Sequence, residues 1–196
     1  MARRGLLLVL LALLALPLLS QTKYALVIGL GKQEDRAWPK INGDKDVPRV
    51  RQMLRKGGYD KIISLVNERA TKRNILSAFN TLVGKARPGD IFYIHYSGHG
   101  QQVADPHHDE PDGLDERWIT ISACTSAQSN AELRNPVAGR LTYALWQILS
   151  DQSSMSNAEL ERRIKRFYQG IRSRVYQTPV ITGEYKNLQR ISDFLR

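Results

Sequence analysis

His99 and Cys124 are the two residues of this 196-residue chain whose types suit nucleophilic catalysis. His99 lies between Gly98 and Gly100, shortly after the apolar run at residues 91–94, so it follows the end of a predicted buried strand. Glycines allow a sharp turn and the close approach of another group, and open α/β sheets bind ligands at the carboxyl ends of their strands. Imidazole transfers protons near neutral pH and, beside a thiol, generates a nucleophile that attacks carbonyl groups. The sequence therefore predicts that His99 is a general base, with Cys124 as the candidate nucleophile.

Cys124 is the single cysteine of the chain, so an internal disulfide is excluded and a structural interpretation stays open beside the catalytic one. Free cysteine is among the most buried residue types, and Cys124 also fits a core position. A parallel crossover from the His99 strand to a strand at residues 118–124 needs about a dozen residues or more, normally with a helix. Residues 101–117 carry six carboxylates and no helical stripe, so they do not supply that helix.

Alternating strands and helices are predicted to position these residues. Apolar patterning predicts strands at residues 23–30, at 61–66 and from 91 to the His99 turn, with helices at 46–56 and 71–85 between them. Thr71 is a good N-cap for the second of these helices. This β-α-β-α-β order implies a parallel sheet with right-handed crossovers.

The second half of the chain is predicted to continue in the same style. It contains a strand at 118–124, a helix at 141–149, a helix that begins with the Ser156–Glu159 capping box and runs to about residue 170, and a short edge strand at 179–182.

Length, charge and the N-terminus narrow the class of protein. The length suits one domain with a substantial core. The net charge of +10 comes from Lys and Arg scattered over several predicted helices without interleaved aromatic residues, so a nucleic-acid site is not expected. Residues 1–20 combine a basic start with an apolar block and are predicted to be a secretory signal peptide, which implies a periplasmic or secreted protein. The block is short for a membrane span, and a retained membrane anchor is the alternative.

Several blocks resemble the bacterial metacaspases and caspase-like cysteine peptidases. They are Tyr-Ser-Gly-His-Gly at 96–100 followed by Asp-Gly-Leu-Asp-Glu at 112–116, the first strand and loop at 24–31 and 41–47, and the later blocks at 121–128 and 139–145. The resemblance implies an α/β caspase-like fold, a mainly parallel sheet flanked by helices on both faces. It implies a single domain at 21–196, with a large-subunit-like part at 21–117 and a C-terminal-subunit-like part at 118–196.

The resemblance also implies a function and a set of site residues. The function is that of a cysteine endopeptidase cleaving after Arg or Lys, with His99 as base and the Gly100 amide in the oxyanion hole. Asp46 resembles an acid of the S1 pocket, so the implied partners are proteins or peptides with basic residues. The oligomeric state does not follow from these residues.

The acidic segment resembles the place where some members of the family bind an activating calcium ion. Asp112, Asp115 and Glu116 offer oxygen ligands of the kind that Ca²⁺ prefers, and a solvated acidic loop is the alternative. No cofactor is required otherwise. The adjacent His107 and His108 point apart, so we expect exposed loop residues there and not a zinc site.

The chain departs from the family pattern at the nucleophile. In the family, a further acidic segment, a helix and a strand ending in Asp-x-Cys-His-Ser-Gly follow the acidic block, and this chain lacks that motif. The 25 positions from His99 to Cys124 also differ from the caspase spacing of about 50. Two alternatives to ordinary catalysis follow: a catalytically inactive remnant that binds basic peptides, or an enzyme in which Cys124 replaces the nucleophile. A missing crossover also predicts an unpaired strand edge in the sheet.

Overall fold

The computed structural model describes residues 21–35, 37–100, 119–125, 127–151, 154–183, 187 and 190–195. The predicted signal peptide lies outside this part of the chain. Within the described ranges, no helix is both long enough and apolar enough to cross a membrane.

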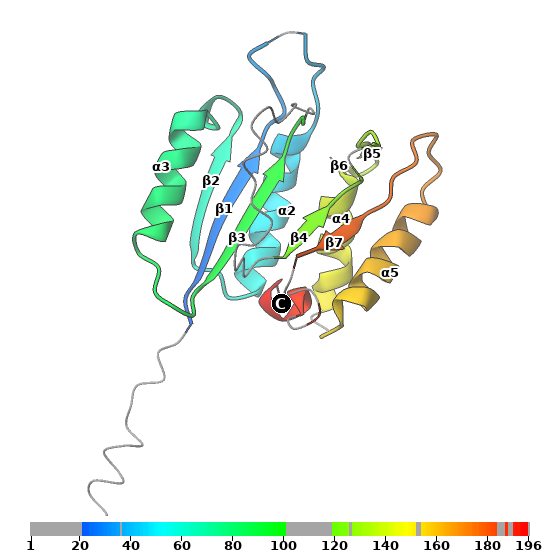
Figure 1. Cartoon of the computed structure of the whole chain (residues 1–196). Helices are drawn as coiled ribbons and strands as arrows, with labels where there is room; N and C mark the ends of the chain where they lie inside the picture. The colour runs from blue at the N-terminus through cyan, green and yellow to red at the C-terminus, as the bar shows by residue number, and fades with distance from the viewer. Residues whose placement is uncertain are drawn as a thin grey trace, which may run out of the picture.

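A three-stranded parallel sheet forms the first half of the molecule (Figure 1). Its strands are β1 (Lys23–Gly29), β2 (Lys61–Val66) and β3 (Ile91–Ser97), in the order β2-β1-β3. The connections contain α2 (Gly43–Lys56), the short 3₁₀ turn η1 (Asn67–Arg69) and α3 (Lys72–Val83). This arrangement confirms the predicted β-α-β-α-β unit and its parallel sheet.

The two helices of this unit begin at different kinds of residue. The hydroxyl of Thr71 accepts a hydrogen bond from the amide of Asn74 at 3.2 Å, which confirms the predicted N-cap of α3. Helix α2 begins at Gly43, three residues before the predicted start, so Pro48 lies within the helix and not in its first turn. Asn42 precedes α2 without a side-chain cap, which is why capping chemistry did not indicate this start.

The second half contains short strands and three further helices (Figure 1). Strand β4 (Thr120–Ser122) pairs antiparallel with β7 (Val180–Thr182), and β5 (Glu132–Arg134) with β6 (Val137–Gly139). The helices are α4 (Arg140–Ile148), α5 (Asn157–Gln169) and α6 (Ile191–Leu195), with the 3₁₀ turn η2 (Leu149–Asp151) after α4. The Ser156 hydroxyl accepts from the Glu159 amide at 3.2 Å, as predicted for the start of α5.

Helices cover both faces of the parallel sheet, because successive residues of β1 pack into different cores. Ala25 and Val27 join the larger core with residues of α2, α4, α5 and α6. Leu26 and Ile28 join the smaller core, to which α3 contributes Ala78 and Leu82. Such alternation is the geometry of a strand buried on both faces. The structure thus confirms a mainly parallel α/β sheet flanked by helices on both faces.

Strand β3 lies at the edge of its sheet among the described strands. The Ile91 amide donates to Thr22 O at 2.9 Å, and Ser97 O accepts from Leu30 N at 2.8 Å, so these two residues face the β1 side. Since backbone groups alternate along a strand, those of Phe92, Ile94 and Tyr96 face the opposite side. No hydrogen-bonded pair of described strands joins β3 to β4; the connection between them lies outside the described residues, so the missing crossover stays a prediction.

Candidate active site

The carboxyl ends of β1 and β3 meet the amino end of α2, and this junction positions His99. A side chain on Gly43 would place its Cβ 2.2 Å from Ser97 O and 2.6 Å from Leu30 O, so only glycine fits. Helix α2 can therefore begin directly against the two strand ends. On the other side, Asn67 follows β2 with a φ of 47°, and its side-chain oxygen accepts from the Gly31 amide at 2.8 Å.

His99 lies two residues beyond β3 and is partly exposed. Its Nε2 is 2.7 Å from the carbonyl oxygen of Pro39, and its ring centroid is 5.0 Å from that of Trp38. A carbonyl only accepts, so Nε2 carries the proton in this arrangement and Nδ1 of the neutral ring holds the lone pair. The Tyr96 hydroxyl donates to the His99 carbonyl at 2.7 Å and braces the turn. The ring is thus held through Nε2 on Pro39 and against Trp38.

Asp46 lies in the first turns of α2 with no exposed surface. The Ser97 hydroxyl donates to its Oδ2 at 2.6 Å, and the Gly139 amide lies 3.0 and 3.2 Å from its two oxygens. Burial raises the pKa of this carboxyl, while hydrogen bonds from Ser97, Gly139 and Thr142 oppose the shift. The structure thus places Asp46 at an enclosed junction of β3, β6 and α4. Its role in substrate binding stays a prediction.

His95 is a polar residue of the same junction that the sequence reasoning missed. It is 9% exposed, with Nδ1 3.4 Å from the Tyr93 hydroxyl and Nε2 3.4 Å from the Thr142 hydroxyl. Burial lowers the pKa of His95 to about 4, so the ring is neutral at pH 7. The signal for it is the alternation of β3, which directs Tyr93, His95 and Ser97 toward one face.

Cys124 follows β4 and is partly buried. Its Sγ lies 3.4 Å from the carbonyl oxygen of Gln128, to which it donates. Burial raises the pKa of the Cys124 thiol, and a hydrogen bond with Gln177 opposes that shift. Reactive cysteines need the opposite shift, because the thiolate is the nucleophile. The thiol is therefore held in its protonated form.

The described contacts bring together one part of the predicted site and not the other. Ser97 lies two residues before His99, and its hydroxyl donates to Asp46. The predicted residues His99 and Asp46 therefore lie at the same junction. Cys124 contacts Gln128 and Gln177, and no described contact joins it to His99. The pairing of His99 with Cys124 stays a prediction.

The remaining predicted site residues lie at or beyond the limit of the described part. Gly100 is exposed, and among the described residues no heavy atom lies within 4 Å of a Cβ built on it. Asp112, Asp115 and Glu116 lie outside the described residues, so calcium binding stays a prediction. Across the part of the chain that is described, no three His, Cys, Asp or Glu side chains are placed to hold a metal ion.

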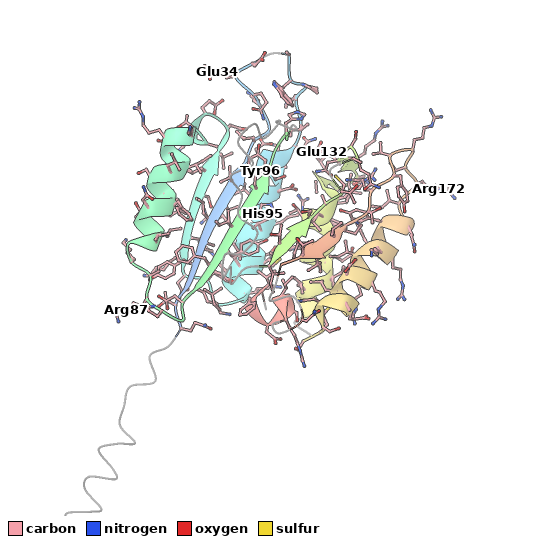
Figure 2. All side chains as sticks on the ribbon, in the orientation of Figure 1. Glu34, Arg87, His95, Tyr96, Glu132 and Arg172 are labelled. Atoms are coloured by element: carbon pink, nitrogen blue, oxygen red, sulfur yellow. The ribbon has the colours of Figure 1, made fainter. Side chains whose placement is uncertain are left out.

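Carboxylates gather at this end of an otherwise basic molecule. Glu132 accepts from the amide and the side chain of Asn42 at 2.6 and 2.7 Å. Asp44, on α2, has an Oδ1 that is buried without a hydrogen-bond partner among the described residues. Figure 2 shows Glu34 and Glu132 at the end where β1 and β3 finish, and Arg87 at the opposite end. Together with the buried Asp46, these acids line the carboxyl edge of the sheet, where Lys45 lies beside Asp44.

Comparisons with known proteins agree with the fold and the His99 motif. A model of the metacaspase, peptidase C14 domain family matches residues 23–133. Metacaspase-1 of Candida albicans is 40% identical over 113 residues, which are 50% of this chain and 24% of that protein. Metacaspase-1 of Mycosarcoma maydis is 37% identical over 84 residues, 39% of this chain and 21% of that protein. The chain thus spans about a quarter or less of the length of these curated relatives.

A solved structure extends the likeness to almost the whole chain. The crystal structure of protein GSU0716 from Geobacter sulfurreducens superposes with a TM-score of 0.67 at 18% identity, covering 89% of this chain and 100% of that one. At this identity the likeness concerns the fold alone. The matched residues include most of the chain and the whole His99 turn, and the chain belongs to the metacaspase family of C14 peptidase domains.

Proposed function

We propose that this chain is a metacaspase-family domain that recognises basic segments of proteins without cleaving them through a thiol of its own. The observation that carries the proposal is the position of Cys124. The chain has one cysteine, whose thiol donates to Gln128 and has a raised pKa, while His99 is held by Pro39. A thiol-dependent peptidase needs the thiol and the imidazole within hydrogen-bond reach of each other.

The acids at the carboxyl edge support a basic partner. Asp44, with its unpartnered Oδ1 and an 18% exposed side chain, is the acid best placed to gain from a cation. Lys45 approaches it only to 3.7 Å and is itself 62% exposed, so this ion pair is weak. Oδ2 of Asp44 already accepts from the Asn67 side chain at 3.4 Å, so an incoming Lys or Arg that displaced the groups around the buried Oδ1 would supply the one hydrogen bond that the carboxylate lacks.

Cysteine endopeptidase activity after Arg or Lys is the second candidate, and the arrangement of His99 favours it. Its Nδ1 has no hydrogen-bond partner among the described residues, and the ring is partly exposed beside Gly98 and Gly100. Movement of Cys124 to this nitrogen would complete a dyad in which the thiolate attacks the peptide carbonyl and the imidazolium protonates the leaving amine.

Fluorogenic peptides ending in Arg or Lys separate the two functions. The protein is incubated with them, with and without calcium, beside the variants His99→Ala and Cys124→Ser. We expect no turnover above that of the variants under either condition. Turnover that both substitutions abolish would overturn the proposal in favour of the peptidase, and dependence on calcium would support the predicted ion site.

Binding of the same peptides tests recognition directly. We expect a saturable complex with Arg- or Lys-containing peptides that weakens about tenfold in Asp44→Asn, the loss of one charge-assisted contact. Asp60→Asn removes the same charge next to the start of β2, at the other end of the sheet, and serves as the control. Equal affinity in the two variants, or no binding by the unmodified protein, would contradict the proposal.

A further inference from the structure

A cavity of about 500 Å³ lies away from the His99 site, between the amino end of α4, the second half of α5 and residues 171–179. Among the described residues that line it, three are cations, Arg140, Lys165 and Arg174, and none is acidic. Cavities of this volume are within the range that holds small molecules. Figure 2 shows Arg172 in the same segment after α5, pointing outward from the molecule.

Arg140 is the buried cation in the wall of this cavity. It is the first residue of α4 and only 5% exposed. One terminal nitrogen donates to Val175 O at 3.0 Å and the other to the Ser173 hydroxyl, while Nε is buried with no partner among the described residues. No carboxylate in the described part forms an ion pair with Arg140. Buried charges are normally paired, so a guanidinium in this state lacks its counter-ion.

The neighbouring charges point to the same ligand class. Lys165 forms an ion pair with Glu161, whereas Arg174 is exposed at the cavity. The amino end of α4 carries a partial positive charge and the carboxyl end of α5 a partial negative one, so the two helix dipoles oppose each other here, and Arg140 and Arg174 are the lining cations without an ion pair among the described residues. Planar guanidinium groups bind carboxylates and phosphates through paired hydrogen bonds.

The apolar part of the cavity indicates the rest of the ligand. Tyr176 is 78% exposed and Val175 is 38% exposed, and both line the cavity. An inorganic ion would leave these side chains in water. A ligand with an apolar body would cover them and remove apolar surface from water.

We propose that this cavity binds a small organic anion, with its carboxylate or phosphate on Arg140 and Arg174 and its body against Tyr176 and Val175. Binding would supply the counter-ion of Arg140 and fix residues 173–176 against α4. The site is independent of His99 and of the basic-peptide recognition at the other site.

Calorimetric titration of the full chain with phenyl phosphate, benzoate and inorganic phosphate at fixed ionic strength tests this site. We expect one saturable site, tighter for the aromatic anions than for inorganic phosphate. Preference for phenyl phosphate or for benzoate identifies the head group, and either result supports the site. Absence of saturable binding by all three probes would overturn it.

Variants distinguish this site from general attraction to a basic protein. Arg140→Gln should abolish binding, but it also removes the bonds to residues 173–175 and can unfold the protein. Arg174→Gln changes only an exposed cation and should weaken phenyl phosphate binding about tenfold, the value of one charged contact. Arg162→Gln removes the same charge from a 69% exposed position on α5 and should leave affinity unchanged. Equal weakening by Arg174→Gln and Arg162→Gln would refute the proposal.

Discussion

At the scale of single residues, the junction beneath His99 is a buried polar network that joins β3 to α2, β6 and α4. Thr142 contacts both His95 and Asp46, so the neutral imidazole and the buried carboxyl are linked through one hydroxyl. Both groups have pKa values that burial moves toward the neutral form. Such networks fix one arrangement of the packed elements, because each member loses its partners in any other.

His95 makes stability depend on pH in a defined window. Its pKa is about 4 in the folded protein and near 6.5 when unfolded, so the unfolded chain binds the proton more tightly. The stability is full above about pH 6.5 and falls as the pH drops toward 4, by at most about 3 kcal/mol. Urea unfolding of the protein and of His95→Gln across this range checks it, and the variant should show a flatter profile. The raised pKa of Asp46 favours the folded protein at low pH, which is the opposite direction, and this contribution is present in both proteins. Parallel stability profiles for the unmodified protein and His95→Gln would therefore contradict the assignment to His95.

At the scale of elements, sequence patterns were sufficient wherever a cap or a periodic stripe was present. Thr71 and Ser156 cap their helices with their own hydroxyls, and β1 is a continuous apolar run, so these elements were predictable. The start of α2 was not, since Gly43 is required by contact with Ser97 and Leu30, which are distant in sequence. Three-residue strands such as β5 and β6 are too short for a period to be visible.

The candidate site also has a part that the sequence predicts and a part that it does not. The glycines around His99 and the strand before it indicated a functional turn. The environment of Cys124 depends on Gln177, in a segment without periodicity, and therefore required the fold. The burial of His95 was equally difficult to predict, because alternation along the strand is the only local pattern that indicates which face a histidine occupies.

The edge strand β3 predicts a tendency to self-associate. Ile94 and Tyr96 are 52% and 50% exposed on the strand whose outer backbone groups face away from β1. Exposed apolar edge strands pair with other chains, and a lysine on such an edge opposes that. Ile94→Lys should slow aggregation at high protein concentration several-fold, measured by light scattering. Tyr176→Lys, the same charge change at an exposed apolar residue away from β3, is the control, and an equal effect there would attribute the result to net charge.

At the scale of the whole molecule, the described strands form three separate sheets, one of three strands and two of two strands. The larger core takes Ala25 and Val27 from β1 and Ile181 from β7, with α2, α4 and α5 between them. No hydrogen-bonded pair of described strands joins any of these three sheets to another. The halves are therefore held together by side-chain packing and by the polar junction at Asp46. The His99 turn lies on one half and the cavity beside Arg140 on the other.

That junction sets the cooperativity of unfolding. The carboxylate of Asp46, on α2, receives the amide of Gly139, on β6, and so ties one half to the other. In the unmodified protein, where this hydrogen bond is present, the two halves should unfold in a single calorimetric transition. Asp46→Ala leaves the Gly139 amide and the Ser97 hydroxyl without their acceptor, at a cost of about 3 kcal/mol, and should broaden or split that transition. Asp60→Ala should leave it single. A buried carboxyl therefore links the half with the three-stranded sheet to the half with the β4-β7 and β5-β6 pairs, which share no strand with it.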